Sequence, residues 1–202
     1  MSSQNWRDAV QAYIRREARP ADKFGHQPRL YALATQIGEG MEYDDEVVFA
    51  AAWMHDLGVF LGHRPQEPEA LAHWDHVPYT IERTRVVLSQ CGFPLGKLDA
   101  VAEAIRTHQA EAEPVTLEAT LLHDADILEQ LGAVGAMRAI AKVGRDTRFE
   151  DFSSVVAGLQ KALDHLPARI RLERAMTLAL PKLEILQALL AAVEREAGNQ
   201  LY

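Results

Sequence analysis

Three aspartates occur in stretches of the sequence that are otherwise apolar. Asp56 follows His55 directly after the apolar run Val47–Met54, and Asp124 and Asp126 lie among leucine, alanine and isoleucine residues. An ionised carboxylate is costly to bury unless a cation or a hydrogen-bond donor compensates its charge. The sequence therefore predicts that these carboxylates have positively charged partners in the folded protein.

Basic side chains near in the sequence do not supply those partners. No lysine or arginine occurs between Arg29 and Arg64, or between Arg106 and Arg138. A divalent metal ion is the economical alternative, with histidine nitrogens completing its coordination shell. Two imidazoles and two carboxylates suit Mn²⁺, Fe²⁺, Co²⁺, Ni²⁺ or Mg²⁺ with positions left open for water. A closed structural zinc site would favour cysteines, and this chain has only Cys91.

Four elements, in this order, resemble the signature of the HD-domain metal-dependent phosphohydrolase superfamily, in its small bacterial single-domain branch. His26-Gln-Pro-Arg29 is similar to the H-x-x-R opening, and Ala50–Gly58 is similar to the A-A-x-x-H-D-[IL]-G core. Ala104–His108 resembles the A-I-x-x-H segment. Leu117–Gly135 resembles the stretch L-E-A-x-x-x-x-D-A-D-x-L-x-x-x-G-A-x-G. The resemblance covers residues 22–145 and extends more weakly to the C-terminal helix.

The resemblance implies a metal site. Its ligands would be His26, His55, Asp56 and Asp126, holding one ion, or two ions that share Asp56 as a bridging catalytic residue. Asp126 takes the position of the final ligand in the family's D-A-D pattern. Asp124 would then assist catalysis by orienting a histidine or a water molecule. The metal is expected to be Mn, Mg, Fe, Co or Ni.

Three further residues are candidates for catalysis. Arg29 lies one helical turn after His26, on the same helix face, where its guanidinium can donate two hydrogen bonds to a phosphate. His76 and His108 are expected to bind the substrate phosphate, to hold a second metal, or to protonate the leaving group. Other histidines of this region are interpreted as surface or packing residues: His63, His73 and His123.

The family resemblance implies a phosphohydrolase that uses metal-activated water on a small phosphorylated substrate. A nucleotide is the favoured substrate class, cleaved at a phosphomonoester or pyrophosphate bond. Two alternatives stay open. One is a di-iron oxygenase on the same scaffold, which His76 and His108 would permit. The other is a nucleotide-binding module without catalysis.

The chain departs from several subfamilies of this superfamily. Val59 stands three residues after Asp56, where other groups carry a lysine or an acidic residue. There is no Gly-Tyr-Pro element, which argues against hydrolysis of cyclic-di-GMP. The segment after the His-Asp pair also lacks the Glu-Asp pair of guanosine tetraphosphate hydrolases. These absences narrow the subclass and leave the substrate open.

Helical periodicity dominates the elements that must position these residues. The fold class is therefore all-α, a bundle of about nine helices without a convincing strand. Two irregular stretches are expected, 57–75 and 145–153, and Pro181 is expected to kink the last helix. The expected helices span 5–19, 26–40, 44–55 with Gly58 as the stop, 78–91, 97–108, 117–131, 133–144, 154–163 and 167–198.

Length and composition indicate an ordinary globular protein. The chain has 202 residues, 48% of them hydrophobic and 25% charged, which predicts one domain over 1–202. Its core motifs lie in 22–145, and helices in 154–198 are expected to pack on them. The apolar run Leu183–Val193 is either core or the face of a homodimer.

Charge and targeting signals restrict the partners. The net charge is 21 − 29 = −8, which argues against a broad nucleic-acid surface. A small anionic substrate remains compatible, because a metal reverses the sign of the local field. A single cysteine favours a reducing compartment. No apolar run approaches 18 residues and no signal peptide is visible, so we expect a cytoplasmic protein that does not bind membranes.

Overall fold

The computed structural model describes residues 3–145, 149–197 and 200–201. Within these residues the regular elements are ten α-helices and four 3₁₀ turns, without a strand. This confirms the all-α prediction. The helices are α1 Ser3–Glu17, α2 His26–Ile37, α3 Asp45–Met54, α4 Pro68–Ala72, α5 His76–Cys91, α6 Leu98–Arg106, α7 Leu117–Gln130, α8 Gly132–Ile140, α9 Phe152–His165 and α10 Glu173–Ala197.

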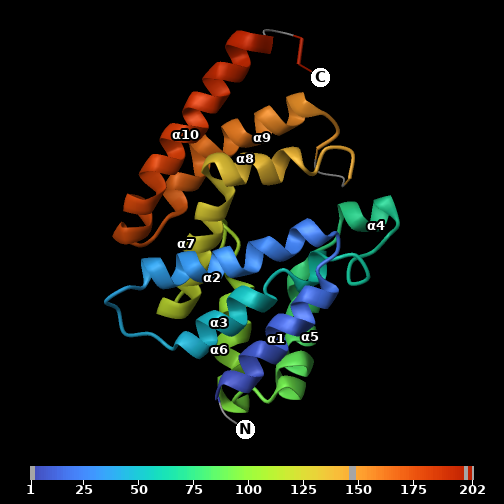
Figure 1. Cartoon of the computed structure of the whole chain (residues 1–202), viewed down its shortest axis with the longest axis vertical. Coiled ribbons are helices and arrows are strands. Elements are labelled where there is room, and N and C mark those ends of the chain that lie inside the picture. Colours follow the sequence, from blue (N-terminus) through green and yellow to red (C-terminus); the bar gives the residue numbers. More distant parts are fainter. Residues whose placement is uncertain (1–2, 146–148, 198–199, 202) are drawn as a thin grey trace. The chain divides into compact units, whose positions relative to one another are not determined.

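The chain divides into two compact units, Met1–Ala125 and Asp126–Tyr202. The boundary falls inside α7, so this helix contributes residues to both units (Figure 1). The organisation of 1–202 as one functional domain stays a prediction.

Helix α3 is the centre of the first unit. It packs against α1, α2, α5 and α6, and all of Val47–Met54 is buried, as expected for a helix that is apolar on every side. Its N-terminus is capped as predicted, because the Asp44 carboxylate accepts the backbone N–H of Glu46 at 3.1 Å. The polar residues that follow α3 therefore begin deep inside this unit.

The end of α3 agrees with the prediction to within one residue. The helix ends at Met54 with His55 as its C-cap, so the stop lies before Gly58. After Asp56 the chain tightens into a 3₁₀ turn, η2, at Leu57–Val59. The His-Asp pair therefore lies at the junction of α3 and η2, with His55 fully buried.

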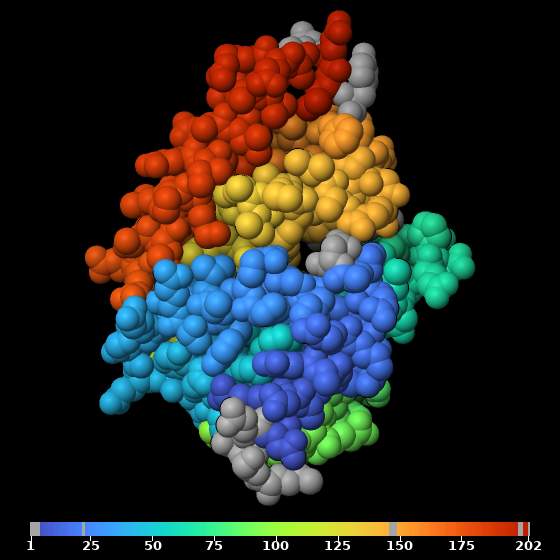
Figure 2. Space-filling view, viewed as in Figure 1, coloured from blue at the N-terminus to red at the C-terminus, as the bar shows by residue number. Residues whose placement is uncertain are grey.

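The predicted loop 57–75 contains more structure than expected. Besides η2 it holds the short helix α4, none of whose residues is buried. In Figure 2 the green segment around α4 stands out as a knob of exposed residues. A helix without a buried face has no apolar periodicity, which is why the sequence did not reveal it. Of the second predicted loop, 145–153, residues 146–148 lie outside the described part of the chain.

In the second unit, α8, α9 and α10 pack on one another. Two glycines shape the turn from α7 into α8. Gly132 has a φ of +72°, which favours glycine. A Cβ at Gly135 would lie 2.2 Å from the carbonyl oxygen of Gln130, so only glycine fits there. The buried Glu129 accepts a hydrogen bond from Arg138 at 3.3 Å, which ties α7 to α8.

The C-terminal helices begin and end differently from the prediction. Pro167 lies in a separate 3₁₀ turn, Leu166–Arg169, and α10 starts only at Glu173. Helix α10 continues through Pro181, where a kink was expected. Its predicted end at Gly198 lies outside the described residues.

By length and composition, α10 could cross a membrane. An 18-residue window of this helix has a mean hydropathy of 1.5, and 17% of that window is buried. Core helices of soluble proteins can have the same length and composition. Helix α10 packs on α8 and α9 through the buried residues Ala175, Ala179, Leu186 and Leu190. The absence of a membrane partner stays a prediction.

Candidate metal centre

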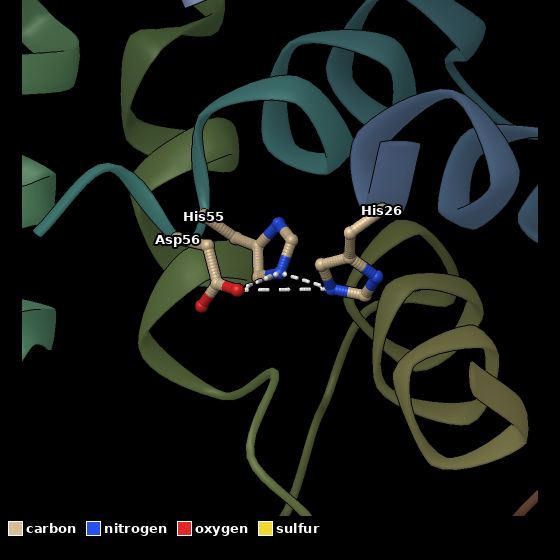
Figure 3. Close-up of side chains that lie close together, drawn as sticks. All are labelled: His26, His55 and Asp56. Carbon is tan, nitrogen blue, oxygen red and sulfur yellow. Dashed lines mark hydrogen bonds and ion pairs between the residues drawn. The ribbon is translucent and has the colours of Figure 1, made fainter. Parts of the chain in front are cut away.

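Three of the four predicted metal ligands lie together in the first unit (Figure 3). His26 is the first residue of α2, and His55 and Asp56 follow α3. The Nε2 atoms of His26 and His55 are 3.2 Å apart. Asp56 Oδ2 lies 3.7 Å from His26 Nε2 and 3.6 Å from His55 Nε2. The two histidines are buried, while 21% of the Asp56 side chain is exposed.

The orientation of His55 is set by its backbone surroundings. Its Nδ1 lies 3.0 Å from the carbonyl oxygen of Ala52. A carbonyl oxygen only accepts hydrogen bonds, so Nδ1 must carry the proton. In the neutral ring, the lone pair on Nε2 therefore faces His26 and Asp56. Such a hydrogen bond to the other ring nitrogen is typical of metal-binding histidines.

The spacing of these ligand atoms fits a divalent metal. With metal–ligand bonds of about 2.1 Å, neighbouring ligand atoms lie roughly 3.0 Å apart at right angles and roughly 3.4 Å apart in a tetrahedron. The observed separations of 3.2–3.7 Å are close to these values. Two imidazole nitrogens beside a carboxylate are a donor set that suits a shared divalent cation.

A second group of potential ligands shares Asp56. His76 Nε2 lies 3.7 Å from Asp56 Oδ1, and the ligand atoms of Asp56, His76 and His108 all lie within 4.8 Å of one another. His108 donates its Nδ1 proton to the carbonyl oxygen of Ile105 at 2.6 Å. Asp56 thus turns Oδ2 towards His26 and His55 and Oδ1 towards His76, which is the arrangement of a bridging carboxylate.

Charge keeps Asp56 ionised. Burial of its carboxyl group raises the pKa, but electrostatic interactions with four surrounding imidazoles, led by His55 and His26, outweigh burial. They hold the pKa of Asp56 well below its usual range. The carboxylate is therefore available as a metal ligand throughout the physiological pH range.

The other predicted site residues are placed differently. Arg29 is half-buried on α2, and its Nη1 atom would lie 2.9 Å from a Cβ at Gly25. The guanidinium thus folds back over the start of α2, next to His26. Asp126 is the first residue of the second unit. It is half-buried, and its carboxylate accepts a hydrogen bond from the Gln130 amide at 3.2 Å. Its role as fourth ligand stays a prediction.

Asp124 was expected to orient a histidine or a water molecule, and the structure places it beside the neighbouring His123. Both Asp124 and His123 are fully buried, and His123 Nδ1 lies 3.0 Å from Asp124 Oδ1. His123 is thus a packing residue, one of the two options predicted for it. His63 also packs, with Tyr79 and Glu17 as partners. His73 is exposed.

The start of α5 was predicted two residues too late. His76 is the first residue of α5 and not part of an irregular stretch before Pro78. The reason is a cap at Asp75, whose carboxylate accepts the backbone N–H of Val77 at 3.0 Å. The first turn of α5 lies against Gly58, whose backbone N–H donates to Thr80 Oγ1 at 3.0 Å. The aspartate before the helix was a signal for this earlier start.

Comparisons with known proteins agree with this geometry. The family model described as HD domain matches residues 24–131, more than half of the chain. Among solved structures, Bacillus subtilis YpgQ superposes with a TM-score of 0.75 at 22% identity, over 99% of this chain and 100% of the other. YpgQ has also been solved in complex with ADP. A predicted HD superfamily hydrolase from an uncultured Thermotogales bacterium has a TM-score of 0.62 at 22% identity, covering 97% and 93% of the two chains.

A curated relative is longer than this chain. Ribonuclease Y of Desulforudis audaxviator is 27% identical over 139 residues, which is 68% of this chain and 24% of the relative. The chain thus spans about a quarter of that protein's length. The matched family segment, 24–131, contains both histidine groups around Asp56. The chain belongs to the HD domain family, with the fold of HD-superfamily hydrolases.

Proposed function

We propose that this protein is a divalent-metal-dependent phosphohydrolase acting on a small phosphorylated substrate, with nucleotides as the first class to test. The observation that carries the proposal is the convergence of His26 Nε2, His55 Nε2 and Asp56 Oδ2 within 3.2–3.7 Å. Such a set of two imidazole nitrogens and a carboxylate oxygen fits one divalent metal ion.

Two relatives support a reaction at phosphorus. The name Ribonuclease Y describes cleavage of a phosphodiester, and the complex of YpgQ with ADP shows that a protein of this fold holds a nucleotide. The net charge of −8 favours a small substrate over a long nucleic acid. A short RNA nevertheless belongs in the substrate panel, because of the first relative.

Each residue has a defined task in the proposed reaction. His26, His55 and Asp56 hold the metal, with Asp126 as the predicted fourth ligand. When bound, a divalent metal lowers the pKa of a water molecule and neutralises charge on the phosphate. Arg29 donates hydrogen bonds to a phosphate oxygen.

Two imidazoles are available for the proton of the leaving group. The attacking water gives one proton to solvent as its oxygen forms a bond to phosphorus, and the bond from phosphorus to the leaving oxygen breaks. His76 or His108, in its protonated form, gives a proton to that oxygen. Both rings reach Asp56, since the potential ligand atoms of the three residues lie within 4.8 Å of one another.

The test is metal-dependent release of phosphate or pyrophosphate. The protein is stripped with chelator, and Mn²⁺, Mg²⁺, Co²⁺ or Ni²⁺ is restored separately with nucleotides, phosphomonoesters and a short RNA. His55→Ala and Asp126→Ala should each lower kcat/KM more than about 100-fold, since even residues that only orient a metal ligand cost about 10–100-fold. The matched control is His165→Ala, which changes an exposed histidine on α9 and should leave turnover intact.

Metal binding without hydrolysis would contradict the proposal. If the protein binds a metal but hydrolyses none of the substrates with any ion, the hydrolase proposal is wrong. Nucleotide binding without turnover would then identify a binding module.

A second candidate, a di-iron oxygenase, rests on one observation. Asp56 turns one carboxylate oxygen to each histidine group, which is how a carboxylate bridges two metals. Two bound irons per chain and substrate-dependent oxygen consumption would support this candidate. Full hydrolytic activity with Mg²⁺ or Ni²⁺ alone, neither of which activates oxygen here, would exclude it.

A further inference from the structure

The site depends on a contact between two segments that are far apart in the sequence. His76 reaches Asp56 only because the first turn of α5 lies on η2, and these two elements pack closely. We propose that Gly58, Trp74 and Thr80 form a clamp that places His76 against Asp56. This Gly58 clamp rests on the proposed function, because it assigns positioning residues to the same site.

The first feature of the clamp is the close approach of α5 to Gly58, which is possible because glycine has no side chain. Among the described residues, Gly58 is not one of the glycines with positive φ. A glycine is therefore required here by the lack of space for a side chain and not by the backbone conformation. A Cβ on this residue would lie 2.9 Å from both the Cβ and the carbonyl oxygen of His76, and 2.8 Å from Thr80 Oγ1. Any larger residue would therefore push the start of α5 away from η2.

The second part consists of two hydrogen bonds to the backbone of Gly58. Its N–H donates to Thr80 Oγ1 at 3.0 Å, and its carbonyl oxygen accepts the Trp74 indole N–H at 2.9 Å. Gly58 and Thr80 are both buried. Buried backbone groups need such partners, so these two bonds determine how α5 and the residue before its cap lie on η2.

The clamp acts on the site through His76. Thr80 follows His76 by one helical turn, so both side chains lie on the same face of α5. On that face His76 Nε2 lies 3.7 Å from Asp56 Oδ1, and its ring is 5.6 Å from the ring of His108. A shift of α5 would lengthen both the distance from His76 to Asp56 and the distance from His76 to His108. Gly58, Trp74 and Thr80 are therefore positioning residues and do not themselves contact the substrate.

A direct test follows the His76 ring in the metal-free protein. Thr80→Val removes one hydrogen bond while conserving shape, and Trp74→Phe removes the other while keeping an aromatic ring. In ¹H–¹⁵N spectra of the imidazoles, both variants should shift the His76 signals, and Thr80→Ser should restore them. The matched control is Thr84→Val, one turn further along α5, where a buried hydroxyl has no hydrogen-bond partner in the described part of the chain. This control should leave the His76 signals unchanged.

An activity test connects the clamp with catalysis. Thr80→Val and Trp74→Phe should lower kcat about 10–100-fold, since a misplacement of about 1 Å can cost about 100-fold. Each should also lower the melting temperature by several degrees, because a buried backbone group loses its partner, while leaving the protein folded at the assay temperature. In a His76→Ala background the same substitutions should have no further effect on kcat. Thr80→Ser should recover most of the activity, and Thr84→Val should retain it.

Three results would overturn the clamp. One is unchanged His76 signals in both Thr80→Val and Trp74→Phe. Another is an equal loss of kcat from these substitutions with and without His76. The third is a loss of kcat in Thr84→Val as large as in Thr80→Val. An inactive wild-type protein would contradict the proposed hydrolase, and the spectra of the metal-free protein would still decide whether the clamp positions His76.

Discussion

Asp56 is the residue on which both histidine groups depend. Its two oxygens face different imidazoles, with Oδ2 3.6 Å from His55 Nε2 and Oδ1 3.7 Å from His76 Nε2. Removing this carboxylate would leave several imidazoles close together without a negative partner, which is costly in a buried site. Asp56 therefore belongs to the ligand set and to the electrostatic balance of the core at the same time.

A second polar group joins three helices away from the site. Arg7 on α1 donates to Asp45 Oδ2 at 2.8 Å, and Tyr31 on α2 donates to Asp45 Oδ1 at 2.8 Å, beside the start of α3. Burial, then the hydrogen bond to Asp45 and its charge, raise the pKa of Tyr31 to about 12. The neutral phenol is thus the form that stabilises the folded state.

This raised pKa predicts a loss of stability at alkaline pH. The unfolded-state pKa of tyrosine is about 10. A raised folded-state pKa means that the contribution of Tyr31 is complete below pH 10 and is lost as pH rises towards 12. Urea unfolding of the wild type between pH 8 and pH 12 should show this loss, and Tyr31→Phe should remove that part of the pH dependence. An identical pH profile for the two proteins would contradict the prediction.

At the scale of elements, the turn from α7 into α8 leaves no room for a side chain at Gly135. A Cβ at Gly135 would lie 2.2 Å from the backbone oxygen of Gln130, and backbone atoms cannot move aside as a flexible side chain can. Gly135→Ala should therefore lower the free energy of unfolding by about 1–3 kcal/mol, the usual cost of overpacking. The urea midpoint measures this change.

A matched glycine provides the control for that experiment. Gly96 lies in a 3₁₀ turn where a Cβ would meet nothing within 4 Å, and its φ is not positive. Gly96→Ala should leave the stability unchanged or raise it slightly, because alanine restricts the unfolded chain. Equal urea midpoints for Gly135→Ala and Gly96→Ala would show that the contact with Gln130 does not limit the turn.

For the whole molecule, metal binding and folding are linked. A metal that binds the folded protein at about 100 times its Kd adds about 2.7 kcal/mol to the free energy of unfolding. For a chain of this length that raises Tm by roughly 5–10 °C. Mn²⁺ should produce this rise in the chelator-stripped wild type and EDTA should reverse it, as followed by circular dichroism.

Two histidine variants make that measurement specific. His55→Ala should lose the Mn²⁺-dependent rise in Tm, because it removes one of the converging ligands. His165→Ala, at an exposed position on α9, should keep it. A rise of the same size in both variants would place the bound metal somewhere other than at His26, His55 and Asp56.

The amino-acid sequence was sufficient for the helices that bury an apolar face and for the family. An apolar run and a capping aspartate are local properties, so α3 with its cap at Asp44 could be predicted from neighbouring residues. The family motifs are likewise short segments with their own spacing, and they singled out His26, His55 and Asp56. The exposed helix α4 was missed because it buries no residue and shows no apolar pattern.

Tertiary packing alone determined how the site residues meet. Contacts such as Gly58 with Thr80, or Asp56 with His76, join residues about 20 positions apart, and local patterns do not encode such distances. Likewise, no pattern indicated which oxygen of Asp56 faces which histidine. The physical reason is that a helix fixes the spacing of its own side chains, whereas close packing against other helices fixes where those side chains lie in space.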